Sequence, residues 1–336
     1  MSKKNSSAIL KEGFKGNAEL SKIYLNFKSK INNIKKKTFL VAVSGGPDSL
    51  ALAALAKSYT NEKKIKFYYV LVNHNLRDNS SSEANSVKKL LKKHKISLVI
   101  LNNKKTIKNN LQKQAREVRY NLLKSFCKKK KISNILTAHN LEDQVETFFI
   151  RLSRGSGLHG LSSMRTSNKL SSSIKLIRPL LEIKKLQLIK ISKLIFGKYY
   201  EDPTNVNTKY LRTRIRNFRK TLEKSGISYD QIFQSIKNLA SSRDTIDLYL
   251  NKFFGDIVKK QKNKTLIDFK KYDYLNLEMK ARVLNKTIKE LNNSYYGLRT
   301  KKIYNLIDHL KLKKKGYSLG GCQIERDKDH IILKKS

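Results

Sequence analysis

The amino-acid sequence predicts an α/β protein, in which a parallel-sheet domain is followed by a smaller, mainly helical domain that ends in a β-hairpin. Three observations predict this class. From about residue 38 to residue 160, strand-like and helix-like segments alternate regularly. These strands are nearly all apolar, which is typical of parallel strands that are buried on both faces of a sheet. After Gly226 the pattern becomes mainly helical, and the last segment alternates around a Gly-Gly turn.

The expected strands of the first domain are FLVAV (39–43), KFYYVLVNH (66–74), SLVILN (97–102), NILTAHN (134–140) and SIKLIRPLL (173–181). The expected helices are SLALAALAKSY (49–59), SSEANSVKKLLKKHK (81–95), NNLQKQAREVRYNLLKSFCKKKK (109–131) and EDQVETFFIRLSRG (142–155), with another beginning near Glu182. Right-handed crossovers between parallel strands would place these helices above and below the sheet. Ligands of such sheets bind outside the carboxyl ends of the strands.

The second domain is expected to begin near residue 225, which divides the chain into residues 1–225 and 226–336. Its main helical patterns lie at 230–254 and 276–292. The closing segment GYSLGGCQIERDKDHIILKK (316–335) alternates apolar and polar residues, which indicates a hairpin.

Charge limits the expected partners. The chain of 336 residues has 73 lysine and arginine residues against 26 acidic ones, a formal net charge of +47. Such an excess favours a polyanion, and nucleic acid is the expected partner. The alternative is a coding bias toward lysine, since runs such as KKKK (128–131) are typical of a solvated surface.

Cysteine content and apolar patterning exclude several other classes. Cys127 and Cys322 are too far apart in sequence to indicate a redox pair or a zinc site. No apolar run approaches the length of a membrane span, so no membrane partner is expected. The N-terminus lacks the apolar core of a secretory signal, which predicts a cytosolic protein of a bacterium or a plastid. The oligomeric state is left open, with a homodimer as one option.

A glycine-rich hexapeptide, SGGPDS (44–49), follows the first strand and opens a helix. Backbone N–H groups in this position form an anion site, and the helix dipole favours phosphate. The hexapeptide lacks the lysine of the common mononucleotide P-loop. Asp48 would repel phosphate unless a cation lay between them, which predicts a metal role for Asp48 with bound Mg²⁺. The alternative is that Asp48 and Ser49 only cap the helix.

The hexapeptide resembles the pyrophosphate loop of the N-type ATP pyrophosphatases, which split ATP into AMP and pyrophosphate while adenylating a carbonyl oxygen. Other segments resemble one family of that superfamily, the tRNA(Ile)-lysidine synthetases. They are VNHNLRDNSSSEA (72–84), AREVRY (115–120), TAHNLEDQVETFFIRLSRGSGLHGL (137–161) and EDPTNVNTKYLRTRIR (201–216). The resemblance implies an adenine nucleotide alpha hydrolase-like PP-loop domain in residues 1–225 and a tRNA-binding domain in 226–336.

The resemblance also implies a reaction, with ATP and L-lysine as substrates and Mg²⁺ as cofactor. ATP adenylates O2 of the wobble cytidine in the CAU-anticodon tRNA(Ile), and the ε-amine of free lysine then displaces AMP at C2. The products are lysidine, AMP and pyrophosphate. The modified base pairs with A instead of G, so decoding changes from AUG to AUA and tRNA identity from Met to Ile.

Site residues follow from the matching segments. The residues assigned to ATP and pyrophosphate are Ser44, Gly45, Gly46, Pro47, Asp48 and Ser49. Asp143, Glu146 and Thr147 share one face of an expected helix, because they stand at positions i, i+3 and i+4. The two carboxylates suit a substrate ammonium or a metal, and lysine binding is assigned to them. The alternative is that they only complement the helix dipole.

Two further positions, His139 and Arg116, receive a role. His139 ends a strand and is assigned to nucleotide or phosphate contact. Arg116 is assigned to the active site, since guanidinium groups bind phosphate, with a solvated helix face as the alternative. The catalytic set is therefore Asp48, Arg116, His139, Asp143 and Glu146. Arg119 and His74 have no assigned role, and Asn73 stands where the family pattern commonly has an aspartate.

The expected tRNA contacts are Arg154, Arg212, Arg214 and Arg216, with exposed helix charges as the alternative. The nearest rivals within the superfamily are tRNA thiolases, whose sulfur transfer needs reactive cysteines or an iron-sulfur cluster that this chain does not supply. Ammonia-using amidating synthetases would not explain the positive charge. A rival from another class is an RNA-binding module with a decayed ATP site, and the intact loop argues against it.

Overall fold

The computed structural model describes residue 14 and residues 16–35, 37–63, 65–104, 111–201, 207–292, 297–312 and 316–336. The chain divides into two compact units. One contains Met1–Thr147 and Met164–Tyr229, and the other contains Phe148–Ser163 and Asp230–Ser336. Residues 202–206 of the matched segment 201–216 lie outside the described residues.

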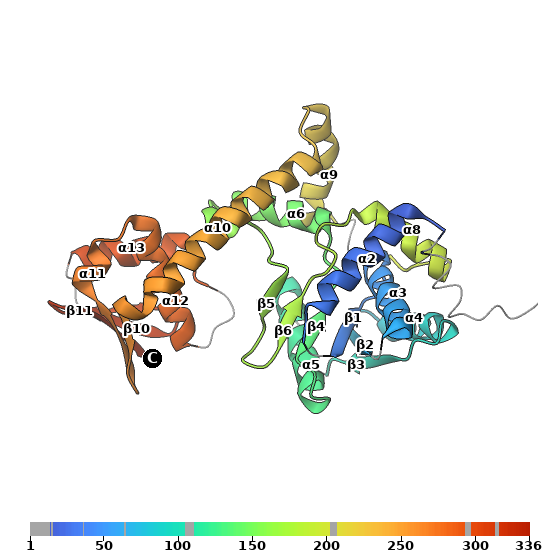
Figure 1. Cartoon of the computed structure of the whole chain (residues 1–336), viewed down its shortest axis with the longest axis horizontal. Helices are drawn as coiled ribbons and strands as arrows, with labels where there is room; N and C mark the ends of the chain where they lie inside the picture. Colours follow the sequence, from blue (N-terminus) through green and yellow to red (C-terminus); the bar gives the residue numbers. More distant parts are fainter. Residues whose placement is uncertain are drawn as a thin grey trace, which may run out of the picture. The chain divides into compact units, whose positions relative to one another are not determined.

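The first unit is built on a sheet of six described strands in the order β3-β2-β1-β4-β6-β5 (Figure 1). They are β1 (Thr38–Val43), β2 (Lys66–Asn73), β3 (Leu98–Asn102), β4 (Asn134–Leu136), β5 (Ser167–Lys169) and β6 (Lys175–Ile177). The pairs β1–β2, β2–β3, β1–β4 and β4–β6 are parallel, which confirms the predicted parallel sheet. The edge strand β5 pairs antiparallel with β6, which the sequence pattern did not indicate.

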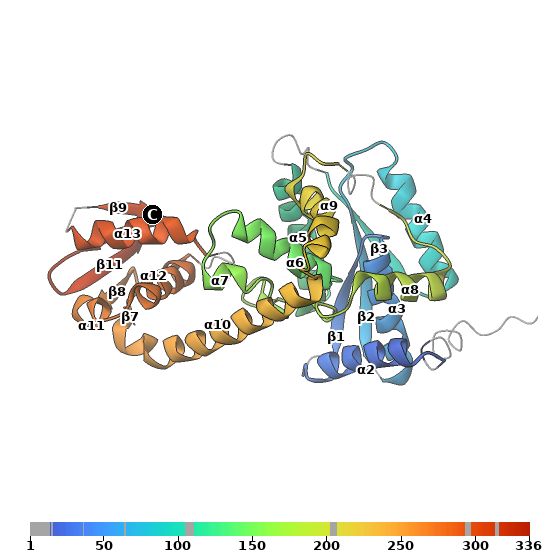
Figure 2. The ribbon, with the colours of Figure 1, turned by 90° about the horizontal axis from the view of Figure 1, so that it is seen from above.

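Helices cover both faces of this sheet, because its strands are apolar on both sides (Figure 2). The helices that lie wholly or mostly in this unit are α2 (Ala18–Asn32), α3 (Pro47–Glu62), α4 (Ser80–Lys93), α5 (Leu111–Lys129), α6 (Leu141–Leu152), α8 (Lys185–Phe196) and α9 (Leu211–Lys224). On one face, Phe39 and Val41 of β1 pack in a core shared with α2, α3, α4 and α8. On the other face, Leu40 packs with Leu123 and Cys127 of α5.

The strand order reverses at β1, because β2 lies on one side of it and β4 on the other. At such a point the loops that follow the two neighbouring strands diverge and leave a crevice outside the carboxyl edge of the sheet. The segments that leave β1 and β4 carry the hexapeptide 44–49 and residues 137–140. The fold therefore brings two of the matched segments to one edge.

The second unit combines helices with an antiparallel sheet of order β7-β8-β11-β10-β9. Its strands are β7 (Val258–Lys260), β8 (Lys264–Asp268), β9 (Tyr317–Leu319), β10 (Cys322–Arg326) and β11 (His330–Lys335). Its helices are α7 (Leu158–Leu161), α10 (Tyr229–Ile257), α11 (Phe269–Asp273), α12 (Leu277–Leu291) and α13 (Thr300–Lys311). The predicted terminal hairpin is confirmed, because the Gly-Gly turn joins the antiparallel strands β9 and β10. β10 also pairs antiparallel with β11, and all three strands lie in a larger sheet than the sequence indicated.

One segment of the second unit comes from an unexpected part of the sequence. Residues 148–163 group with the second unit, although they stand between two parts of the first. The predicted boundary near residue 225 places residues 148–163 in the first domain, because it divides the chain at one point only. That boundary stays a prediction. None of the helices in the described parts combines the length and apolar character that a membrane crossing requires.

Candidate active site

The side chain of Ser49 holds the loop between β1 and α3. Its Oγ accepts hydrogen bonds from the backbone N–H of Ser44 at 3.0 Å and of Gly45 at 3.2 Å. It also donates to the carbonyl oxygen of Gly46 at 3.0 Å. Pro47 occupies the first turn of α3, where its missing N–H costs no hydrogen bond. The six residues predicted to bind ATP thus form a short loop, 44–46, and the first turn of α3, and the Ser49 side chain joins the two.

Gly45 is the position in this loop that requires glycine. Its φ is +89°, a left-handed conformation that side chains rarely adopt. A Cβ atom at Gly45 would lie 2.6 Å from Cγ2 of Val87, so α4 closes the space on that side. The carbonyl oxygen of Gly45 accepts a hydrogen bond from the N–H of Tyr200 at 3.0 Å. The chain after α8 therefore helps to fix the loop.

Asp48 lies in the first turn of α3 with one unsatisfied carboxylate oxygen. Its Oδ1 is buried and has no hydrogen-bond partner in the part of the chain that the structure describes. Burial and the negative charge of Asp143 raise the pKa of Asp48 to about 7, and a hydrogen bond from Asn140 opposes the rise. Additional positive charge at this position would stabilise the ionised carboxylate.

A magnesium ion fits this donor set. A buried, unpartnered carboxylate oxygen is a suitable ligand for a hard cation. Within the described ranges, no group of three or more His, Cys, Asp and Glu side chains is placed to hold a metal. Mg²⁺ is usually held by one or two carboxylates together with substrate phosphates, so a single aspartate in a phosphate loop is consistent with it.

The first turn of α6 places the predicted lysine-binding carboxylates. The side chain of Asn140 accepts a hydrogen bond from the N–H of Asp143 at 2.9 Å, and the Asp143 carboxylate accepts one from the N–H of Asn140 at 3.1 Å. This reciprocal capping satisfies two N–H groups at the start of the helix. Asp143 thus has a structural role at the start of the helix, which was the alternative to lysine binding. Its negative charge also raises the pKa of Asp48.

Glu146 is buried between two arginines of α9. Its side chain is 3% exposed and pairs with Nε of Arg212 at 2.8 Å and with Nε of Arg216 at 2.5 Å. Nη2 of Arg216 donates a second hydrogen bond to the carboxylate at 3.2 Å. Burial raises the pKa of Glu146, and the bond from Arg216 opposes that rise. Two residues predicted to contact tRNA are therefore bound to a residue predicted to bind lysine.

The pairing between α6 and α9 extends to further charges. Nη2 of Arg212 lies 3.7 Å from Oδ1 of Asp143. Nη1 of Arg219 lies 3.7 Å from Oε1 of Glu142, whose other oxygen accepts a hydrogen bond from the N–H of Lys185. Sequence reasoning did not assign roles to Glu142 and Arg219. Their spacing of three or four residues from assigned neighbours on the same helices was the available signal.

His139 follows β4 and lies among three arginines. Its Nδ1 is 3.0 Å from Oγ1 of Thr137. Burial lowers the pKa of His139 to about 4, with smaller contributions from Arg178, Arg116 and Arg212. The imidazole is therefore neutral at neutral pH. The guanidinium of Arg116 also lies 4.8 Å from the ring centre of Tyr120, one turn further along α5.

Arg178 is a candidate that sequence reasoning missed. It follows β6 and is 3% exposed. Its Nη1 donates to the carbonyl oxygen of Arg165 and to Oδ1 of Asn168, both at 2.8 Å, and its buried Nε has no partner among the described residues. An arginine in the middle of the apolar run KLIRPLL was the signal in the sequence. Its charge acts on His139, so it belongs to the same cluster.

His74 and Asn73 lie at the end of β2. His74 had no assigned role, and Asn73 stands where the family pattern commonly has an aspartate. Both ring nitrogens of His74 are buried without a partner in the described structure, and burial lowers its pKa to about 4. Asn73 is buried, and its side-chain amide donates to Ser81 at 3.2 Å and to Asn102 at 3.3 Å. Asn73 therefore acts in the packing of β2 against its neighbours.

The two remaining predicted tRNA contacts are exposed arginines. Arg154 is exposed and belongs to residues 148–163, which group with the second unit. Arg214 is exposed on α9, and its Nη1 donates to the carbonyl oxygens of Thr208 and Lys209 at 3.4 and 3.5 Å. Within the first unit the structure thus gathers the predicted catalytic residues Asp48, Arg116, His139, Asp143 and Glu146 with Arg212 and Arg216. Arg214 of the same unit has other contacts.

The fold and the loop geometry define an ATP-using α/β protein of the PP-loop class. In agreement, the family model described as PP-loop domain matches residues 19–221, and the chain belongs to that family. Relatives identify the branch. The tRNA(Ile)-lysidine synthase of Wolbachia pipientis wMel is 33% identical over 300 residues, which cover 87% of this chain and 69% of that protein. The chain belongs to the tRNA(Ile)-lysidine synthase family, as the matching segments predicted.

Other relatives agree. The tRNA(Ile)-lysidine synthase of Rickettsia typhi (strain ATCC VR-144 / Wilmington) is 31% identical over 327 residues, covering 93% of this chain and 73% of that protein. The one from Orientia tsutsugamushi (strain Boryong) is 40% identical over 183 residues, covering 54% of this chain and 41% of that protein. Among solved structures, the U34-tRNA thiolase NcsA from Methanococcus maripaludis aligns with a TM-score of 0.56 at 18% identity, over 66% of this chain and 78% of that one. This last likeness concerns the fold alone.

Proposed function

We propose that this chain is the ligase that joins free L-lysine to C2 of the wobble cytidine in the CAU-anticodon tRNA(Ile), at the expense of ATP. The observation that carries the proposal is one charge cluster at the carboxyl edge of the sheet. The unsatisfied oxygen of Asp48, in a loop that suits phosphate, lies within the electrostatic reach of Asp143. Nucleotide chemistry and amine binding would therefore share one site in a chain of this family.

The first step would form a bond between O2 of the cytidine and the α-phosphorus of ATP, and break the bond between the α and β phosphates. The leaving pyrophosphate would lie on the loop 44–49, where the N-terminus of α3 stabilises negative charge. Asp48 would hold Mg²⁺, which neutralises phosphate charge when bound. Arg116 supplies a further positive charge near His139, and the neutral imidazole offers a hydrogen bond to the nucleotide.

The second step would form a bond between Nζ of lysine and C2 of the cytidine, and release AMP with the former O2. The ε-ammonium must lose a proton before it can attack. Asp143 and Glu146 would bind the ammonium, and the raised pKa of Glu146 makes its carboxylate a better proton acceptor than an ordinary glutamate. Lysine would compete with Arg212 and Arg216 for these carboxylates, since both arginines now occupy them.

The tRNA would be bound largely through phosphate contacts. A net charge of +47 supplies a strong sequence-independent attraction for RNA. Arg154 and Arg214 are exposed and would contact the backbone directly. For Arg212 and Arg216 the predicted tRNA contact stays part of the proposal, and it requires that their guanidinium groups leave Glu146 or bridge it to a phosphate. The homodimer option and the cytosolic location stay predictions.

The decisive experiment is mass analysis of the wobble nucleoside. The full chain would be incubated with ATP, lysine, Mg²⁺ and CAU-anticodon tRNA(Ile), and the tRNA would then be digested to nucleosides. We expect a cytidine that has gained the mass of lysine minus water, with one pyrophosphate released for each. Parallel reactions without lysine, and with a tRNA of another anticodon, serve as controls. If the cytidine gained no mass and no pyrophosphate were released under these conditions, the RNA-binding module would be favoured instead.

A further inference from the structure

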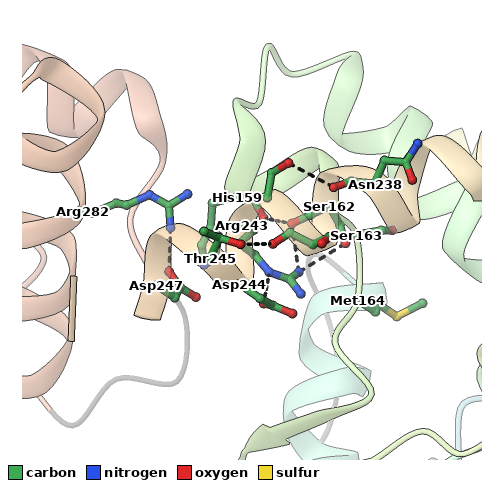
Figure 3. Close-up of polar contacts among 12 residues, drawn as sticks. His159, Ser162, Ser163, Met164, Asn238, Arg243, Asp244, Thr245, Asp247 and Arg282 are labelled. Carbon is green, nitrogen blue, oxygen red and sulfur yellow. Dashed lines mark hydrogen bonds and ion pairs between the residues drawn. The ribbon is translucent and has the colours of Figure 1, made fainter. Parts of the chain in front are cut away.

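Arg243 of α10 is a buried arginine that binds the segment 148–163 within the second unit (Figure 3). It is 4% exposed. Its Nη1 donates to Oγ of Ser162 at 2.9 Å and to the carbonyl oxygen of the same residue at 3.3 Å, while Nε pairs with Asp244 at 3.0 Å. Ser162 is itself buried and donates from Oγ to the carbonyl oxygen of His159 at 3.1 Å. Arg243 therefore fixes the end of residues 153–163, the turn that follows α6.

Arg151 at the end of α6 also binds this segment. Its Nη1 donates to the carbonyl oxygens of Gly160 at 2.7 Å and Ser163 at 2.9 Å. The turn is tightly closed at Gly160, because a Cβ atom there would lie 2.5 Å from Cβ of Ser156. The side chains of Arg151 and Arg243 thus both bind carbonyl oxygens of residues 160–163, at the end of the segment. Both arginines lie outside residues 154–157, which form the tip.

The tip of the turn has the opposite character. Arg154, Gly155 and Gly157 are exposed, and Cβ atoms at the two glycines would meet nothing within 4 Å. Gly155 has a φ of +63°, which allows the chain to reverse directly after Arg154. The turn presents an exposed arginine next to open backbone while its base is fixed by buried hydrogen bonds. This is a suitable arrangement for contact with an extended anion.

We propose that Arg243 is a positioning residue for tRNA binding, which acts by holding Arg154 in the orientation that meets the RNA backbone. The proposal rests on the proposed function, which supplies the tRNA. Burying a guanidinium group is costly, and an apolar side chain of similar size would fill the same space at lower cost. What arginine adds is a set of directed hydrogen bonds to Ser162. Rigid support reduces the entropy that Arg154 loses on binding.

The test is a double-mutant cycle on tRNA affinity, measured by filter binding with the full chain so that turnover is not needed. We expect Arg154→Ala to raise the Kd for tRNA roughly tenfold. Arg243→Met would raise the Kd by a similar factor, with Arg243→Lys in between. In the Arg154→Ala background, Arg243→Met would add less than about twofold, since a residue that acts through Arg154 has nothing left to position.

Arg282→Met is the matched control. Arg282 is also buried in the second unit and pairs with α10 through Asp247 at 2.6 Å, but its contacts do not include the turn. We expect it to lower the melting temperature as Arg243→Met does and to leave the Kd for tRNA unchanged. Equal losses of affinity in Arg282→Met and Arg243→Met would overturn the proposal, and so would independent, multiplicative effects of Arg154 and Arg243.

A second variant covers failure of Arg243→Met to fold. Ser162→Ala removes the Oγ acceptor and leaves the guanidinium in place, and we expect it to raise the Kd about two- to threefold, only when Arg154 is present. An unchanged Kd in this variant would contradict the proposal. Absence of lysidine formation by the wild-type chain would instead overturn the proposed function, and the affinity measurements would still decide the role of Arg243.

Discussion

Glu146 of α6 and Arg216 of α9 form a buried ion pair, joined by hydrogen bonds from Nε and Nη2 to the two oxygens of the carboxylate. The residues are 70 positions apart in the sequence. A bidentate pair of this kind is stronger than a single contact, and breaking it leaves a charge in a site that is 3% exposed.

We expect Arg216→Met to lower the free energy of unfolding by about 1–3 kcal/mol, which is less than for a fully buried pair because the arginine is 30% exposed. Denaturant melts of Arg216→Met, Glu146→Gln and the double variant would measure the coupling. A double variant as unstable as the sum of the single ones would contradict a direct interaction.

Asp48→Asn should abolish tRNA-dependent pyrophosphate release and leave the Kd for tRNA within about twofold of the wild type, because Asp48 is assigned to the metal and not to RNA. Pyrophosphate release and filter binding on the same preparation would test both statements. Turnover near the wild-type rate would refute the metal assignment.

The pKa of Asp48, about 7, lies above its ordinary value of 3.8. A raised pKa favours the folded state at low pH, and this contribution is lost as the pH rises from about 4 to about 7. We therefore expect the melting temperature of Asp48→Asn, relative to the wild type, to rise over that interval and to level off above it. A constant difference would show that Asp48 titrates normally.

Binding of ATP with Mg²⁺ should favour the ionised form of the Asp48 carboxyl and so lower its pKa, because a metal ligand must be ionised. We expect wild-type binding to release protons below about pH 7 and Asp48→Asn to release fewer. Calorimetry in buffers of different ionisation enthalpy would measure the number released. Equal proton release by both proteins would locate the titrating group elsewhere.

Gly45→Ala should remove ATP binding, since the new methyl group meets both a left-handed backbone and the side chain of Val87. Gly197→Ala is a matched control, because Gly197 has a φ of +72° and open space around it. We expect the control to cost about 1 kcal/mol of stability and to bind ATP normally. Loss of ATP binding in both variants would mean that strain alone explains the effect.

The sequence predicted the first sheet well because its strands are apolar on both faces and separated by long amphipathic helices. It missed β5, β7 and β8, because runs of three to five residues such as SNK, VKK and KTLID carry too little periodicity. The hexapeptide and α6 predicted which residues gather at the carboxyl edge, since both follow strands. The pairing of Glu146 with Arg212 and Arg216 was not predictable, because it depends on how α9 packs against α6.

The hydrogen bonds within the loop affect the rate of nucleotide binding. The Oγ of Ser49 accepts hydrogen bonds from the N–H groups of Ser44 and Gly45, and the carbonyl oxygen of Gly45 accepts one from the N–H of Tyr200. The loop is therefore ordered before a nucleotide arrives, and its conformational entropy is lost when the chain folds. Encounter with ATP then requires no slow rearrangement of the loop, so association is expected to be limited by diffusion and orientation.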